Sequence, residues 1–272
     1  MTVYSHSRLS TFEQCPLKFK YRYIDKIKPD FEKSIESHLG TAVHNTLEWI
    51  YNKILEKKPV PTIDQMISYY SKEWQKEFEK EIKIVKNNLT PSDYFNKGIK
   101  FLLDYYIKHS PFQDGTLECE KKVVVEIHGH KLQGFIDRFS YNENNGEYEI
   151  HDYKTANMLP TQEKMDKDRQ LALYSIAIQE SMDAEKICLT WHYLAHNKKI
   201  ISRRTNEQIE ELKNQIKELI EIIESTTEFP AKKSALCGWC EYKSICPKFS
   251  KTQKTKQENI ENYPTAKKYL RD

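Results

Sequence analysis

The chain has 272 residues, enough to bury a sizeable core, although 31% charged residues and a mean hydropathy of -0.78 indicate a strongly hydrated surface. Its 7 glycines exclude collagen-like and glycine-rich low-complexity proteins. No apolar run approaches the ~20 residues of a membrane helix, and the N-terminus lacks the apolar stretch of a secretory signal. We expect a soluble, cytoplasmic protein that has no membrane partner.

The net charge of +3, from 43 Lys and Arg against 40 Asp and Glu, is mildly basic. Such a balance permits a nucleic-acid partner without requiring one, because binding depends on positive charge that gathers on one face. Each lysine-rich run, taken alone, is more simply a solvated surface.

In chain order, the predicted elements begin with helices. Apolar residues at helical spacing predict a first helix capped by Ser7 or Ser10 and a second helix over 41–55. A charged, aromatic helical region follows over 63–109, with a break near Pro91.

Strands and helices then alternate along the rest of the chain. The predicted segments are strands over 119–127, 131–141 and 147–154, a helix over 162–180, strands over 186–195 and near 200, and a helix over 206–225. This order predicts an α/β or α+β domain with a mixed sheet.

Chemistry-bearing residues gather on the hairpin formed by the second and third of these strands. Asn145-Gly146 is typical of a two-residue turn, which sets Asp137 opposite Lys154, whereas a longer loop sets it opposite Asp152. All three side chains share one sheet face in both registers. Two carboxylates suit Mg²⁺ or Mn²⁺, and a lysine orients the nucleophile or stabilises developing charge. The pattern alone is more often a charged, solvated strand face.

Two helical pairs add to this cluster. His44 and Glu48 lie one turn apart on one predicted helix, and Gln170 and Tyr174 lie one turn apart on another. Each pair by itself is more often ordinary helix surface than part of a site.

Cysteines form a second constellation. Cys237, Cys240 and Cys246 have C-x2-C-x5-C spacing, and Cys15, which precedes a proline, is the natural fourth ligand. Cysteines in an intracellular chain favour a metal over disulfides. Four thiolates hold either Zn²⁺ or an iron–sulfur cluster, and the spacing leaves that choice open.

These residues, in order, resemble the RecB-like branch of the PD-(D/E)XK nucleases that carries an iron–sulfur staple. Its members include the AddB nuclease domain, CRISPR-associated single-domain exonucleases, and single-domain mitochondrial and archaeal exonucleases. The matching segments are Ser5–Leu9 with Cys15-Pro16, Gly40–His44, Gly134–Arg138, Asp152–Thr155, Gln170 with Tyr174, and the three C-terminal cysteines.

The resemblance implies a restriction-endonuclease-like fold, in which helices flank a mixed central sheet. The nuclease domain would span 1–250, with a helical insertion over 62–110 and a cysteine cluster over 237–246 that closes onto Cys15. A polar, basic tail would follow over 251–272.

Roles for individual residues also come from the resemblance. It implies that His44, Asp137, Asp152 and the Tyr153 carbonyl bind the metal, and that Lys154 is the catalytic lysine. Gln170 and Tyr174 would contact nucleic acid or shape the site. A 4Fe–4S cluster would be held by Cys15, Cys237, Cys240 and Cys246. An imidazole ligand favours Mn²⁺ over Mg²⁺.

The implied activity is metal-dependent hydrolysis of phosphodiester bonds by an exonuclease on single-stranded DNA. A role in DNA repair or recombination, alongside a helicase or another repair protein, goes with the resemblance. The alternative is a non-catalytic iron–sulfur subunit that binds nucleic acid within a helicase–nuclease complex. That alternative leaves the joint presence of Asp137, Asp152 and Lys154 unexplained, and so does an electron-transfer iron–sulfur protein.

Overall fold

The computed structural model describes residues 2–249 apart from 77, 79–81 and 87, so the predicted tail over 251–272 lies outside the described residues. The helices are α1 (His6–Gln14), α2 (Pro16–Phe19), a π-helical turn (Lys20–Ile24), α3 (Ile35–Leu55), α4 (Ile63–Lys76), α5 (Pro91–His109), α6 (Gln162–Asp166), α7 (Arg169–Met182), α8 (Asn206–Ser225) and 3-10 turns at Leu194–His196 and Ala235–Trp239. The strands are β1 (Val3–Tyr4), β2 (Lys33–Ser34), β3 (Ile82–Lys83), β4 (Thr116–Ile127), β5 (His130–Asn142), β6 (Glu147–Lys154), β7 (Ile187–Tyr193) and β8 (Lys198–Ser202).

Six of these strands form one mixed sheet; the sequence predicts the mixed sheet but not its strand β1. Its order is β1-β5-β6-β7-β8, and β4 pairs with β5 in addition. The β1–β5 and β6–β7 pairs are parallel, and the other pairs are antiparallel. The parallel β6–β7 pair requires a crossover, which α6 and α7 provide. β2 and β3 form a separate two-stranded sheet.

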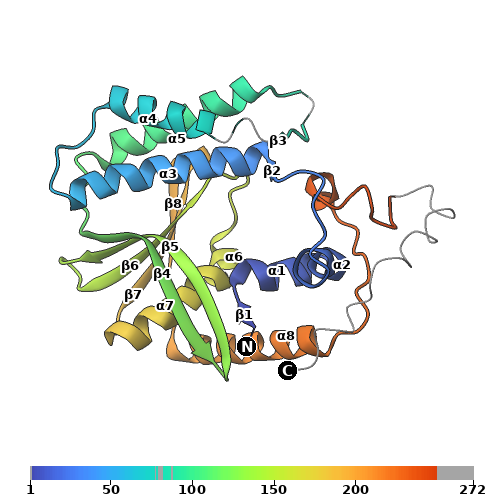
Figure 1. Ribbon diagram of the computed structural model, residues 1–272. Coiled ribbons are helices and arrows are strands. Elements are labelled where there is room, and N and C mark those ends of the chain that lie inside the picture. The colour runs from blue at the N-terminus through green and yellow to red at the C-terminus, as the bar shows by residue number, and fades with distance from the viewer. Residues whose placement is uncertain (1, 77, 79–81, 87, 250–272) are drawn as a thin grey trace.

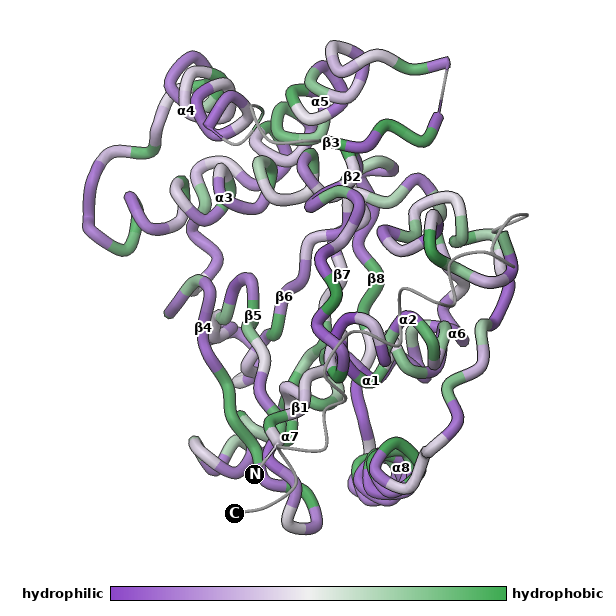
Figure 2. Tube along the Cα trace, turned by 45° about the vertical axis from the view of Figure 1, so that its right-hand side comes forward, coloured by the Kyte–Doolittle hydropathy of each residue, from purple (hydrophilic) through white to green (hydrophobic). Residues whose placement is uncertain are grey.

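Helices cover both faces of the sheet, and each face buries its own core (Figure 1). One core joins α1, α7 and α8 to the sheet, and the other joins α3, α4 and α5 to it. α8 is amphipathic, with its hydrophilic side facing away from the sheet (Figure 2). Within the described residues, every helix is too short or too polar to cross a membrane.

Three helix boundaries differ from the sequence-based expectation. α3 begins at Ile35 and not at residue 41, because Ser34 caps it by accepting from the Ser37 amide. The first helix begins after Ser5, whose side chain accepts a hydrogen bond from the Arg8 amide, and not at Ser7 or Ser10. The helix expected over 162–180 is two helices, because Asp168 has an extended backbone and its carboxylate caps α7.

Candidate active site

The hairpin register brings two carboxylates face to face. β5 pairs with β6 so that Arg138 lies opposite His151, which sets Asp137 opposite Asp152. The longer of the two expected loops therefore forms, and the two-residue turn is wrong. The loop is closed by Asn142, whose carbonyl accepts from the Gly146 amide at 2.9 Å and whose side chain accepts from the Asn144 amide.

Asp152 sits in a tight group with a lysine and a glutamine. Its side chain is only 5% exposed, and the Lys154 ammonium lies 2.8 Å from one carboxylate oxygen and 3.0 Å from the other. Gln170, from the first turn of α7, accepts from Lys154 at 2.9 Å and donates to Asp152 at 3.0 Å. Gln170, expected to contact nucleic acid or to shape the site, thus lies inside the carboxylate–lysine cluster.

Asp137 and His44 meet beside the Tyr153 backbone. His44 reaches over from α3 and donates from Nε2 to the Tyr153 carbonyl at 2.7 Å, because a carbonyl can only accept. When the ring is neutral, this bond leaves the lone pair on Nδ1, and Nδ1 lies 3.4 Å from Asp137 Oδ2. The Tyr153 amide donates to the same Asp137 oxygen at 2.7 Å. His44 Nδ1 and Asp137 are thus oriented as ligands, while the Tyr153 carbonyl already accepts one hydrogen bond.

Glu120 on β4 joins this group, although no motif marked it. One ligand atom each of His44, Glu120 and Asp137 lies within 4.8 Å of the others, and Asp152 is outside that group. The signal for Glu120 was the His128-Gly129 turn: with two residues in the turn, β4 pairs with β5 so that Glu120 faces Asp137. Carboxylate and imidazole donors fit Mg²⁺ or Mn²⁺.

Burial and charge tune these groups in opposite directions. Burial raises the pKa of Asp137 to about 7, the His44 ring opposes this shift, and the Asp152 charge adds to it. Burial also raises the pKa of Glu120, assisted by the Glu48 carboxylate. For Lys154, burial acts to lower the pKa, but Asp152 outweighs it and the pKa is raised. Lys154 is therefore an ammonium at neutral pH and cannot act as a general base.

Tyr174 forms part of the wall of the site and packs on a glycine. It is 7% exposed, and a Cβ atom added at Gly134 on β5 would lie 2.2 Å from its ring. Only glycine therefore leaves room for this ring on the strand that carries Asp137. Tyr174 therefore packs against Gly134 on β5, next to the carboxylates.

A buried polar layer supports the hairpin from the opposite face. The Arg138 guanidinium, on a residue only 2% exposed, pairs with Asp114 at 2.9 Å and donates to the Tyr153 hydroxyl at 3.1 Å. Arg138 therefore does not pair with the neighbouring Asp137, because adjacent strand residues point to opposite faces. The layer fixes Tyr153, whose backbone orients His44 and Asp137.

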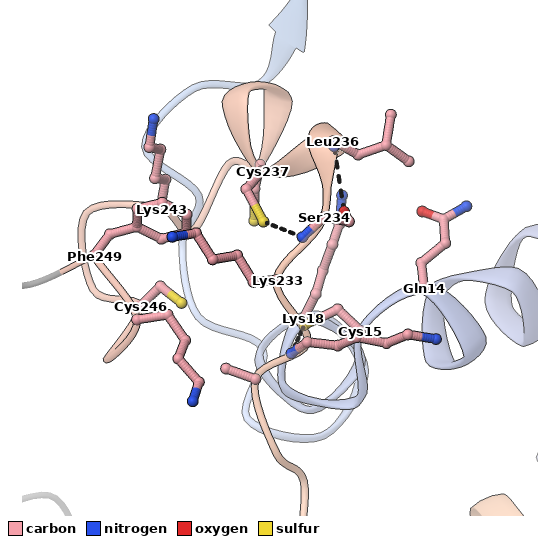
Figure 3. A pocket seen from close by; sticks show the side chains of 14 residues that line it. Gln14, Cys15, Lys18, Lys233, Ser234, Leu236, Cys237, Lys243, Cys246 and Phe249 are labelled. Atoms are coloured by element: carbon pink, nitrogen blue, oxygen red, sulfur yellow. Dashed lines mark hydrogen bonds between the residues drawn. The ribbon is translucent and has the colours of Figure 1, made fainter.

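The four cysteines of the predicted cluster line one pocket between α2 and the C-terminal segment (Figure 3). Backbone amides donate to two of the sulfurs, from Lys232 to Cys15 at 3.5 Å and from Ser234 to Cys237 at 3.3 Å. Among the described residues, no three cysteine sulfurs lie within 4.8 Å of one another. The lysines that line the same pocket are Lys18, Lys232, Lys233, Lys243 and Lys248.

A candidate exonuclease from Eubacterium rectale has a similar structure, with a TM-score of 0.51 and 14% identity over 86% of each chain. A second solved structure, SSO0001, aligns with a TM-score of 0.41 and 16% identity, over 91% of this chain and 86% of that one. No curated protein matches the sequence significantly. The model of the PD-(D/E)XK nuclease superfamily matches residues 3–247. The chain belongs to the PD-(D/E)XK nuclease superfamily, whose members are phosphodiester hydrolases that use divalent metals, and His44, Glu120 and Asp137 form a possible metal site in it.

Proposed function

We propose that the chain is an exonuclease that degrades single-stranded DNA in repair or recombination, with a helicase or another repair protein as partner. The observation that carries the nuclease assignment is the register that sets Asp137 against Asp152, beside Lys154 and His44. The resemblance of the sequence motifs to RecB-like nucleases supports the exonuclease activity and the substrate. Attraction to the charged phosphate backbone provides most of the affinity of proteins for nucleic acid. The many lysines of this chain therefore support a nucleic-acid substrate.

Each side chain then has a defined role. A divalent metal, when bound, polarises a phosphoryl oxygen and lowers the pKa of water. His44, Asp137 and Asp152 would hold it. Lys154, kept charged by Asp152, stabilises the negative charge that develops on the phosphoryl oxygens. Gln170 fixes the positions of both Asp152 and Lys154.

Cleavage of end-labelled single-stranded DNA in Mn²⁺ tests this proposal. Wild type should cut, whereas Lys154→Ala and Asp152→Ala should not, and the exposed Lys167→Ala should cut like wild type. A circular single strand should resist an exonuclease. If wild type binds DNA but does not cut it, the non-catalytic binding subunit becomes the better assignment. If all the proteins cut alike, the activity belongs to a contaminant.

We also propose that the cysteine pocket holds a 4Fe–4S cluster. The support for a cluster over a single zinc is the resemblance of Cys15 with the C-x2-C-x5-C spacing to the iron–sulfur staple of RecB-like nucleases. The surrounding lysines and the two amide donors favour an anionic cluster with thiolate ligands. The backbone of this segment also bonds the N-terminal region, through the Asp30 amide to the Glu241 carbonyl at 2.9 Å.

Anaerobic purification tests the cluster. The protein should be brown and contain about four irons per chain, as a 4Fe–4S cluster requires. Cys15→Ser should lose iron, whereas Cys188→Ser, at a buried strand position away from the pocket, should keep it. Stoichiometric zinc without iron, or full iron in Cys15→Ser, would show that this assignment is wrong.

A further inference from the structure

The strongest unexplained feature near the site is a carboxylate that the sequence motifs do not include. Glu120 lies on β4, opposite Asp137, and its carboxylate oxygen comes within 4.8 Å of ligand atoms of both His44 and Asp137. The three donors come from α3, β4 and β5, so three separate elements converge on one point. A group of imidazole and carboxylate atoms from three elements is a better candidate for a metal site than a row of acidic residues along one surface.

Beside His44, the carboxylates at this point have no lysine or arginine bonded to them among the described residues. Within the described part of the chain, neither Glu120 nor the neighbouring Glu48 forms an ion pair with a lysine or arginine. Lys121, the next residue on β4, pairs with Glu118 at 2.6 Å instead. Lys154 is held by Asp152. Like charges placed this close repel one another, and a bound divalent ion would offset that repulsion.

Glu120 is also set apart by its backbone. Its φ is +48°, in the left-handed region that side chains other than glycine rarely adopt. The residues on either side, Cys119 and Lys121, keep their ladder pairs with Arg138 and Ile136. The strand is therefore distorted at one residue, and that residue faces Asp137.

We propose that Glu120 is a ligand of the catalytic metal, together with His44 and Asp137. The inference rests on the proposed function for the presence of that metal. In this arrangement His44 Nδ1, Asp137 and Glu120 bind one Mg²⁺ or Mn²⁺. Asp152 then completes the centre while it remains bonded to Lys154 and Gln170. The negative charge of Asp152 is partly offset by Lys154. Glu120 would therefore supply additional negative charge to the metal.

Binding of Mn²⁺ to the full-length, DNA-free protein tests the proposal without reference to cleavage. Free Mn²⁺ is followed by electron paramagnetic resonance during titration of wild type and Glu120→Gln, which has nearly the same shape. The matched control is Glu126→Gln, an exposed carboxylate on the same strand. Asp137→Asn tests whether Mn²⁺ binds at the proposed metal centre at all. Circular dichroism checks that each variant is folded.

We expect Glu120→Gln to weaken Mn²⁺ binding at least about tenfold, since even outer-shell partners of metal ligands contribute 10–100-fold. The same ratio should persist in 1 M KCl, where the Debye length falls to ~3 Å and distant charges are screened. Glu126→Gln should bind like wild type.

Three outcomes would overturn the proposal. Wild-type affinity in Glu120→Gln removes the ligand role. A loss that vanishes in 1 M KCl shows a distant charge effect instead. Unchanged binding in Asp137→Asn removes the metal centre, and with it both this inference and the metal dependence of the proposed function. If wild type binds Mn²⁺ through Glu120 but does not cut DNA, the proposed function fails while this inference stands.

Discussion

The side-chain carbonyl of Gln170 accepts a hydrogen bond from the Lys154 ammonium at 2.9 Å. Its amide group donates to Asp152 at 3.0 Å. One side chain from the start of α7 therefore contacts both Asp152 and Lys154, the two residues of β6 that we propose to be catalytic. These bonds give Gln170 the geometry of a residue that positions the pair, in contrast to one that recognises a nucleobase.

Gln170→Ala should lower kcat for single-stranded DNA by about 10–100-fold and change KM by less than about twofold. The reason is that Lys154 and Asp152 lose their common partner, while the surface that binds nucleic acid keeps its charge. Gln179→Ala, later on the same helix, is the control and should keep both parameters. A large rise in KM with kcat unchanged would instead show that Gln170 contacts the substrate.

The central strands could be predicted because period-2 alternation and turn residues are local signals. The hairpin register could not, since Asn145-Gly146 is compatible with loops of two lengths. The choice is made by hydrogen bonds of Asn142, which only the folded loop shows. That choice decides whether Asp137 faces Lys154 or Asp152.

Part of the candidate site could be predicted, because most of its residues belong to short local motifs. His44, Asp137, Asp152 and Lys154 belong to short motifs, and the structure brings them to one end of the sheet. Glu120 belongs to no motif, because its place depends on pairing between two strands and on an unusual φ. Contacts set by strand pairing are invisible to patterns along one segment.

Glu120→Gly should stabilise the metal-free protein. A non-glycine residue in the left-handed region costs about 1–3 kcal/mol, whereas glycine adopts that backbone freely and costs roughly 0.5–1 kcal/mol in entropy. We expect the free energy of unfolding in urea to rise by about 1 kcal/mol, while Mn²⁺ binding weakens. Glu126→Gly, on an ordinary part of the strand, should be destabilising. A fall in stability for Glu120→Gly as large as that for Glu126→Gly would contradict the strain at this position.

Gly134→Ala should destabilise the fold and displace Tyr174. The added Cβ would lie 2.2 Å from the tyrosine ring, and overpacking of this kind costs about 1–3 kcal/mol. Tyr174→Ala removes the obstructing ring, so the double variant should lose less stability than the two single variants added together. Additive losses in this double-mutant cycle would show that the two residues do not contact each other.

Acid should destabilise the protein through the histidines beneath the hairpin. Burial, aided by the Arg138 charge, lowers the pKa of His109 to about 4, and burial lowers the pKa of His151 and His192 well below the ordinary value. His151 and His192 lie 3.0 Å apart, so two positive rings there would repel each other. In the unfolded chain these groups titrate near 6.5, and the unfolded state therefore binds more protons below that pH.

The stability that depends on these neutral rings is thus fully present above about pH 6.5 and is lost as the pH falls toward 4. Urea unfolding between pH 7.5 and 4.5 should show a free energy that decreases by about 1.4 kcal/mol per pH unit for each proton taken up. His109→Gln should reduce this slope, because it removes one of the groups, whereas His128→Gln at the exposed β4–β5 turn is the control. Asp137, whose raised pKa of about 7 contributes a slope of opposite sign, is present in both proteins, so the comparison isolates His109. Equal slopes in wild type and His109→Gln would mean that the His109 ring is protonated in the folded protein without cost.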